Sequence, residues 1–238
     1  MISIIIPTYN EEKYIGKSLK CFREKMTIPH ELIVCDDKSI DKTVEIAGPY
    51  ADIIIEAQVK NPTIAANRNN GAKSAKGDFF VFIDGDSFIE NPDEFFTRAL
   101  NDFRDPKVVA ITGALDIFPQ VKTFGDFFMY KLFNFIHFIK NNVFHSGESS
   151  GKFQMMRRSA FEKVGGFPAD LVTREDALMF NRLAKIGRTL YDGKLVIFHN
   201  GRRAHKFGWP KLLTIWMVET FWVAVFKTSR VKEWIPIR

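Results

Sequence analysis

Short apolar runs that end in polar, mostly acidic residues recur along the first third of the chain. They occupy residues 2–6, 32–35 and 79–83. β-Branched and aromatic side chains dominate the runs, and their length is typical of buried strands in a parallel sheet. Each run leads into a polar turn and then into a helical pattern. This alternation predicts a doubly wound α/β fold, with a mostly parallel sheet flanked by helices.

Polar residues follow the first two runs directly. Pro7 ends the first run, and Asn10 is predicted to be the N-cap of the next helix. Asp36 and Asp37 follow the second run, and Asp41 is expected near the N-terminus of another helix. Helix capping accounts for Asp41 but does not account well for the adjacent pair Asp36 and Asp37.

The third run ends in Asp84, Gly85 and Asp86. Parallel strands deliver the residues after them to the carboxyl edge of the sheet, where α/β folds bind ligands. Glycine between the acids permits close approach of the backbone. Two hard oxygen donors suit Mg²⁺ or Mn²⁺, which commonly bridge a carboxylate to a substrate phosphate. The motif predicts a metal site for a phosphorylated substrate, and a solvated acidic turn is the alternative.

Residues 124–144 are predicted to form an amphipathic helix. One side holds the apolar residues Phe128, Leu132, Phe135, Ile136, Ile139 and Val143. The other side holds the polar residues Lys131, Asn134, His137 and Asn141. The apolar side either packs on the sheet or faces a membrane or partner. Phe127, Tyr130 and Phe138 fall on the polar side and favour the second alternative, because they would be exposed there.

Basic residues concentrate at the end of the chain. Residues 202–238 carry eight basic and two acidic residues, whereas the remainder is neutral. The apolar runs 212–218 and 221–226 are too short for a spanning helix of ~20 residues. Tryptophans flanked by cations are typical of an interfacial anchor on anionic lipid. Nucleic acid is not expected, because the aromatic residues lie in apolar runs instead of among the cations.

Length and composition limit the organisation of the chain. With 238 residues, 46% of them apolar, it suits one large α/β domain. Cys21 and Cys35 do not indicate a disulfide framework. A strand that begins at Ile2 leaves no room for a signal peptide, so we expect a cytoplasmic protein on the inner face of the cell membrane.

Four ordered motifs resemble the family 2 glycosyltransferases, which have the GT-A fold. They are I-I-P-T-Y-N-E at 5–11, V-C-D-D-K-S-I-D-K-T at 34–43, A-N-R-N-N-G-A-K-S-A-K-G-D at 66–78 and F-I-D-G-D at 82–86. A later stretch, from Arg157 to Leu183, is similar to the acceptor half of that family, so the resemblance covers about residues 2–200. It implies a glycosyltransferase domain at 1–201, with a nucleotide-sugar half at 1–115 and an acceptor half at 116–201, before a membrane-associating tail at 202–238.

The resemblance implies a metal-dependent, inverting transfer of a sugar from a nucleotide-diphosphate donor. UDP is the family's commonest carrier, and the acceptor would be lipid-linked or a polysaccharide. Asp86 matches the direct ligand of Mn²⁺ or Mg²⁺, with Asp84 nearer the ribose or a metal-bound water. His199 is a candidate further ligand and His205 the reserve, although either can be structural. The positions that match the nucleotide pocket are Pro7, Tyr9, Glu11, Asp36 or Asp37, and Arg68.

Asp176 matches the family's catalytic base, at the second acid of the pair Glu175-Asp176 that opens a predicted helix. Such a base contributes ~10²–10⁴ in rate. Favourable charge at a helix N-terminus is the alternative for both acids, and suffices for Glu175. Lys152, Arg157 and Arg158 are candidates to meet an anionic acceptor, or are solvated surface cations.

Other classes of protein fit less well. A haloacid-dehalogenase-like phosphatase would use Asp84 as its nucleophile, but usually carries its motif on the first strand. A nicotinamide dehydrogenase needs G-x-G-x-x-G after a strand, which this sequence lacks. A catalytically inert, sugar-nucleotide-binding membrane scaffold is the non-enzymatic alternative, and the presence of Asp84, Asp86 and Asp176 argues against it.

Overall fold

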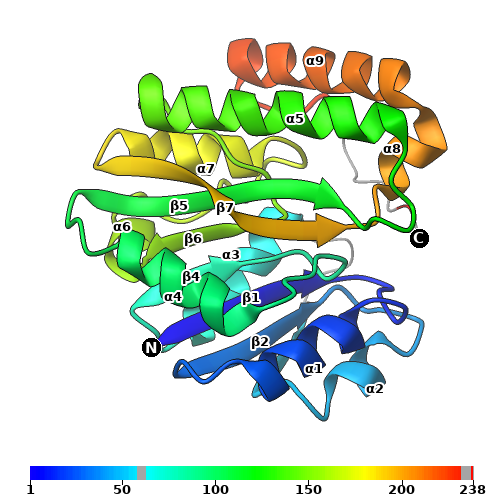
Figure 1. Cartoon of the computed structure of the whole chain (residues 1–238), viewed down its shortest axis with the longest axis vertical. Helices are drawn as coiled ribbons and strands as arrows, with labels where there is room; N and C mark the ends of the chain where they lie inside the picture. The colour runs from blue at the N-terminus through cyan, green and yellow to red at the C-terminus, as the bar shows by residue number, and fades with distance from the viewer. Residues whose placement is uncertain (58–62, 232–236, 238) are drawn as a thin grey trace.

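A seven-stranded sheet forms the centre of the computed structural model, which describes residues 1–57, 63–231 and 237. The strand order is β3-β2-β1-β4-β6-β5-β7 (Figure 1). The strands are β1 (Ile2–Thr8), β2 (His30–Asp36), β3 (Ile53–Glu56), β4 (Phe79–Phe82), β5 (Val108–Ile117), β6 (Gln154–Arg157) and β7 (Arg188–His199). β6 pairs antiparallel with both β4 and β5, and the other pairs are parallel. The predicted mostly parallel α/β sheet is confirmed, but the reversed direction of β6 was not predicted from the sequence.

Helices cover both faces of this sheet. They are α1 (Ile15–Lys25), α2 (Thr43–Ala47), α3 (Ile64–Ser74), α4 (Pro92–Asp102), α5 (Phe124–Phe138), the π-helical turn η1 (Ile139–Val143), α6 (Arg158–Lys163), α7 (Glu175–Ala184), α8 (Arg202–Phe207) and α9 (Trp209–Phe226). One apolar core joins the sheet to α1 and α4, through residues such as Phe22 and Phe96. A second core joins the opposite face to α3, α6 and α7, through residues such as Phe161 and Phe180. Two cores on two faces define the doubly wound arrangement.

The reversed direction of β6 decides which residues reach the carboxyl edge of the sheet. Phe82 at the end of β4 pairs with Gln154 at the start of β6, so the segment just before Gln154 lies at that edge. Phe79 pairs with Arg157, which places Arg157 at the opposite edge. The turn after β4 also reaches β7, because Phe88 forms an isolated bridge with Phe198. The carboxyl edge therefore gathers residues from distant parts of the sequence.

The orientation of α5 contradicts the alternative in which its apolar side packs on the sheet. Most of the polar side faces inward: Asn134 bonds both the N–H and the carbonyl of Leu115, and His137 and Asn141 are buried, whereas Lys131 is exposed. Tyr130, predicted to be exposed, is buried as well, whereas Phe127 and Phe138 are exposed as predicted. The apolar side is exposed, through Phe124, Phe128, Leu132, Phe135 and Ile136, with Val143 and Phe144 beyond the end of α5.

The predicted C-terminal tail begins as packed structure. α8 and α9 lie beside α5 (Figure 1), and Trp209 at the start of α9 is in ring contact with Tyr130 and Phe133. Leu212 and Val223 on α9 are buried. Within the part of the chain that the structure describes, no helix is both long and apolar enough to cross a bilayer. Residues 232–236 and 238 of the predicted tail lie outside the described residues.

One predicted helix cap is wrong. α1 begins at Ile15, so Asn10 is not its N-cap. Asn10 has a φ of 53° and accepts a hydrogen bond from the N–H of Ile40 through its side chain. It therefore joins the turn after β1 to the turn after β2. Asp41 lies near the N-terminus of α2 as expected and accepts from the N–H and the hydroxyl of Thr43, but Lys42 occupies the N-cap position.

Candidate active site

The turn after β4 packs tightly against the turn after β1. A Cβ atom added to Gly85 would lie 3.2 Å from Cγ2 of Thr8 and 3.3 Å from Cγ of Glu11. The N–H of Ser87 donates to the carbonyl of Asp84 and closes the turn. Glycine therefore allows Asp84 and Asp86 to sit directly beside residues from the first turn, as its place between the acids suggested.

Two cations hold Asp86, which is buried. The Lys152 ammonium lies 2.5 Å from its Oδ1, and a guanidinium nitrogen of Arg202 lies 2.8 Å from its Oδ2. Burial alone would raise the pKa of Asp86, but Lys152 and Arg202 hold it well below its usual range. The carboxylate is therefore ionised at neutral pH. Arg202 also lies 2.8 Å from Oε1 of Glu11, which brings the first turn into the same network.

Arg68 on α3 joins Asp84 to α7. Its side chain is only 1% exposed, and its two terminal nitrogens lie 3.0 Å from Oδ1 of Asp84 and 2.8 Å from Oε1 of Glu175. Burial would lower the pKa of Arg68, but Asp84 and Glu175 raise it, so the guanidinium is charged. A Cβ atom at Gly151 would collide with this guanidinium. Arg68 therefore fixes the distance between the acids after β4 and the acids that open α7.

Glu175 and Asp176 open α7, as the sequence predicted. Burial raises the pKa of both carboxyls above their ordinary values, and Asp176 raises that of Glu175 further against the effect of Arg68. The backbone carbonyl of Asp176 accepts hydrogen bonds from Ser149 and from Gln154. Residues on either side of Lys152 in the sequence thus fix the position of the candidate base.

The predicted nucleotide-binding residues lie at the ends of β1 and β2. Asp36 is buried and accepts hydrogen bonds from Thr8 and Ser39. Burial, with Asp36 beside it, raises the pKa of Asp37 to about 6. Pro7 pairs with Cys35 in the sheet, and Tyr9 is half-buried in the turn that follows. The structure brings these residues to one edge, and their contacts with a nucleotide stay predictions.

The two candidate histidines differ in their surroundings. His199 is buried at the end of β7, where its Nδ1 accepts from the N–H of Gly201 and its Nε2 has no hydrogen-bond partner. Burial lowers the pKa of His199 to about 3, so it is neutral. His205 is hydrogen-bonded to Asp126 at 2.8 Å. In the residues that the structure describes, no three His, Cys, Asp or Glu side chains form a ready-made metal cluster.

The donor set nevertheless fits Mg²⁺ or Mn²⁺ in the manner typical of nucleotide enzymes. Asp84 and Asp86 supply hard carboxylate oxygens, and such ions are commonly held by one or two carboxylates together with substrate phosphates. The unpartnered Nε2 of buried His199 is a further polar atom close to this edge. Its Nδ1 already accepts a hydrogen bond, however, so the neutral ring carries its proton on Nε2, and ligation would require the proton to move to the other nitrogen.

Two cations occupy places other than the sequence suggested. Lys152 forms ion pairs with Asp84 and Asp86 after β4. Arg202, which lies in the predicted membrane tail, forms ion pairs with Asp86 and Glu11. Arg157 and Arg158 have other partners. Arg157 donates to backbone carbonyls of Val108 and Phe103 at the opposite edge, and Arg158 pairs with Glu162. No local motif signals Arg202, because only the fold brings it across 116 residues to Asp86.

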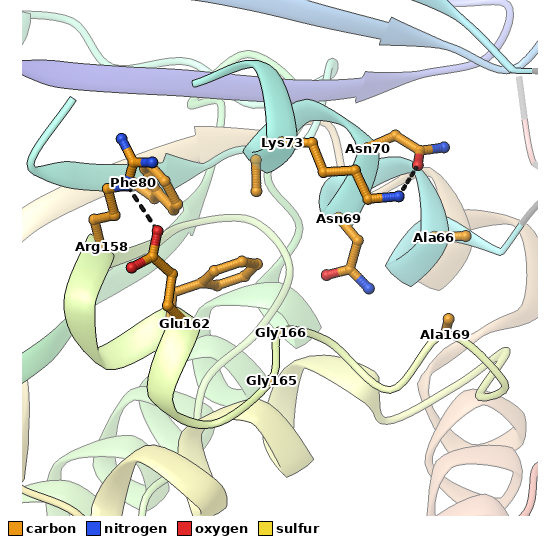
Figure 2. Close-up of a pocket in the computed structure, with 12 residues that line it drawn as sticks. Ala66, Asn69, Asn70, Lys73, Phe80, Arg158, Glu162, Gly165, Gly166 and Ala169 are labelled. Carbon is orange, nitrogen blue, oxygen red and sulfur yellow. Dashed lines mark hydrogen bonds and ion pairs between the residues drawn. The ribbon is translucent and has the colours of Figure 1, made fainter. Parts of the chain in front are cut away.

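A separate groove of about 520 Å³ lies between α3 and the segment around α6 (Figure 2). None of the carboxylates Asp84, Asp86 and Asp176 lines it. Asn69, which does, uses its side chain to bond the backbone N–H and carbonyl of Phe167. The groove is therefore distinct from the acidic edge of the sheet.

The sequence matches the family model "Glycosyl transferase family 2" over residues 3–165. The chain therefore belongs to this family, which is a family of transferase enzymes. It is 30% identical over 196 residues to the O-antigen chain rhamnosyltransferase WbaN of Salmonella anatum, covering 78% of this chain and 61% of that protein. It is 27% identical to the O-antigen chain rhamnosyltransferase RfbN of Salmonella typhimurium, covering 84% and 66%. The chain thus spans less than two thirds of both relatives.

Solved structures show the same fold. The mannosyltransferase PcManGT from Pyrobaculum calidifontis, in complex with GDP-Man and Mn²⁺, superposes with a TM-score of 0.65 at 21% identity, covering 83% of this chain and 56% of that one. TarS 1-349 of S. aureus, in complex with UDP-GlcNAc, superposes with a TM-score of 0.65 at 20% identity, covering 84% of this chain and 58% of that one. The architecture is that of the GT-A glycosyltransferases.

Proposed function

We propose that this protein transfers a sugar from a nucleotide-diphosphate donor, with UDP as the expected carrier, to a hydroxyl of a lipid-linked or polysaccharide acceptor. The reaction is hexosyl transfer with inversion and depends on Mn²⁺ or Mg²⁺. One observation carries the proposal: buried Arg68 connects Asp84 with Glu175, the neighbour of Asp176. This side chain supports the proposal because it holds the acids that we assign to the diphosphate at a set distance from the helix end that carries the proposed base.

The donor half binds the leaving diphosphate. Asp86 and Asp84 would hold the divalent ion, which when bound neutralises the negative charge that develops on the diphosphate. Lys152 and Arg202 place two further positive charges beside Asp86. Pro7, Tyr9, Glu11 and Asp36 or Asp37 line the side where the nucleoside is expected. The sugar then lies between this edge and the start of α7.

The acceptor half supplies the base. As the acceptor oxygen forms its bond to the anomeric carbon, the bond from that carbon to the diphosphate oxygen breaks, and the hydroxyl proton passes to Asp176. Burial, which raises the pKa of Asp176, strengthens it as a proton acceptor. Attack from the face opposite the leaving group inverts the anomeric centre. Arg68, charged and fixed, positions the neighbouring Glu175.

A donor panel tests the proposal. The protein is incubated with UDP-, GDP- and dTDP-sugars, with Mn²⁺ or Mg²⁺, and with a lipid extract as acceptor source, and release of the nucleoside diphosphate is measured. One donor should give sustained release that Asp86→Asn and Asp176→Asn remove. Tight donor binding with no turnover on any acceptor would favour the inert scaffold. The family match argues against the phosphatase alternative.

We also propose that the protein lies on the cytoplasmic face of a membrane, peripherally. The orientation of α5 supports this, because most of its apolar side chains are exposed while the polar side chains of Asn134 and His137 face the sheet. α9, which packs beside it, exposes Met217, Val218 and Phe221. The Lys131 ammonium lies 4.1 Å from the ring centre of Phe127 and so puts a cation beside the aromatic surface. Aromatic residues and cations together suit anionic headgroups.

Vesicle sedimentation tests this location. Replacing Phe128 and Phe135 on α5 by glutamate should release the protein from anionic vesicles, and raising the salt concentration should weaken binding of the unchanged chain. Ile40→Glu is the matched control, because Ile40 is 87% exposed and far from α5 in the sequence. Unchanged protein that stays in the supernatant at low salt would refute the membrane location.

A further inference from the structure

Lys152 lies between the two carboxylates that the proposed metal would use. Its ammonium is 2.5 Å from Oδ1 of Asp86 and 3.3 Å from Oδ2 of Asp84. The ammonium thus forms an ion pair with each of the two carboxylates. A protein cation therefore bridges the two carboxylates that would hold a divalent ion.

All four carboxylate oxygens of this pair are engaged by cations. Arg68 holds Oδ1 of Asp84, Lys152 holds its Oδ2 and also Oδ1 of Asp86, and Arg202 holds Oδ2 of Asp86. Arg68 is fixed by burial and by its second bond, to Glu175. Lys152 is 22% exposed and has a flexible stem, so it is the cation that can leave.

The fold explains why Lys152 lies beside Asp84 and Asp86. β6 runs against β4, so the residues before Gln154 meet the turn that follows β4. Gly151 lies against the Arg68 guanidinium, where any larger residue would collide with it. The backbone beside Lys152 is thereby fixed, while the side chain reaches across to the acids. The placement follows from the sheet and not from a chance surface contact.

We propose that Lys152 is a built-in counter-cation that competes with the divalent ion for Asp84 and Asp86 and takes the donor's diphosphate as its alternative partner. This inference rests on the proposed function for the identity of that partner. Two consequences follow. A divalent ion alone binds weakly, because it must displace the ammonium. A nucleoside diphosphate retains affinity without metal, because the ammonium can turn from the carboxylates to the phosphates.

Two binding measurements on the full chain test the proposal. Mn²⁺ binding without nucleotide is followed by the electron paramagnetic resonance of free Mn²⁺. Lys152→Met should bind Mn²⁺ at least about tenfold more tightly than the unchanged protein, because a like charge has been removed from the site. UDP binding in excess chelator is measured by calorimetry. Lys152→Met should weaken it at least about tenfold, because a phosphate-binding cation is lost.

Three variants serve as comparisons. Lys152→Gln removes the charge but keeps a hydrogen-bond donor, and should resemble Lys152→Met. Lys152→Arg keeps the charge and should resemble the unchanged protein in its Mn²⁺ affinity. Lys163→Met removes an exposed lysine of α6 and should change neither measurement. Circular dichroism and melting temperature establish that each variant is folded, and either charge-removing variant suffices for the comparison.

Equal Mn²⁺ affinities in the unchanged protein and a folded charge-removing variant would overturn the proposal. So would UDP binding that requires Mn²⁺ in the unchanged protein. If the unchanged protein binds no nucleoside diphosphate with or without Mn²⁺, the proposed function fails instead. The comparison of Mn²⁺ affinities then still decides whether Lys152 competes with the divalent ion for Asp84 and Asp86, because that measurement involves no nucleotide.

Discussion

Replacing Arg68 by methionine should destabilise the protein and abolish its activity together. Arg68 is 1% exposed and is ion-paired with Glu175, whose side chain is 8% exposed, and with Asp84, which is 27% exposed. Methionine keeps much of the volume but removes the charge. Glu175 would then remain buried next to Asp176 without its cation.

The magnitude follows from the burial of the pair. Breaking a buried ion pair by removing one partner costs about 3–5 kcal/mol, because the other charge is left uncompensated. The partly exposed Asp84 adds less, since water screens it. For a chain of this size the melting temperature should fall by about 6–20 °C. Replacing Glu175 by glutamine as well removes the stranded charge, so the double variant should regain about 1–2 kcal/mol over Arg68→Met.

The variant should also respond more strongly to pH. Burial and Asp176 already raise the pKa of Glu175, and loss of Arg68 raises it further. A raised folded-state pKa means that the folded protein binds more protons than the unfolded chain. The free energy of unfolding must then fall as pH rises from the ordinary glutamate value of about 4.3 through the folded-state value.

Urea unfolding followed by circular dichroism at several pH values measures these effects. Arg158→Met is the matched control, because Arg158 is 44% exposed and pairs with Glu162 within one helix, so its loss should cost under about 1 kcal/mol. A cost below about 1 kcal/mol for Arg68→Met, with no recovery in the double variant, would refute the buried-bridge reasoning.

Three further results are expected. Asp176→Asn should lower kcat by about 10²–10⁴ with little change in donor affinity, measured by turnover and calorimetry, because a base acts mainly in the transition state; a collapse of donor affinity would make it a binding residue. Asp86→Asn should stay folded by circular dichroism yet lose Mn²⁺-dependent turnover, and full turnover would remove its metal role. Burial would raise the pKa of Asp126, but hydrogen bonds from His205, Thr123 and Trp209 lower it. The ionised carboxylate therefore adds to the free energy of unfolding above about pH 4, and this contribution is lost as the pH falls below the lowered pKa. Tryptophan fluorescence should report release of α8–α9 in acid, and Asp126→Asn should abolish that transition.

The part of the fold that follows from local sequence was predictable. The apolar runs at 2–6, 32–35 and 79–83 lie within or overlap β1, β2 and β4, because each strand is buried on both faces and needs no alternation. The position of Glu175 and Asp176 at the start of α7 was also predictable from the sequence, because acidic residues favour a helix N-terminus. The direction of β6 was harder to predict, because its four residues do not indicate it and only pairing with β4 and β5 determines it.

The cation network could not be derived from the sequence. Lys152 and Arg202 reach Asp86 across 66 and 116 residues, so their roles depend on the complete sheet. The sequence left the orientation of α5 open for another reason. Its amphipathic pattern is real, but a pattern does not say which side faces the protein, and here Asn134 and Asn141 find backbone partners inside. Tyr130 is buried for the same reason, through contacts with Trp209.

The anomeric configuration of the product tests the account most directly. With the donor identified by the panel, the transferred sugar is examined by NMR of its anomeric proton and carbon. Direct displacement with Asp176 as base predicts a linkage of configuration opposite to that of the donor. A product with retained configuration, or release of free sugar with no transfer to any acceptor, would contradict it.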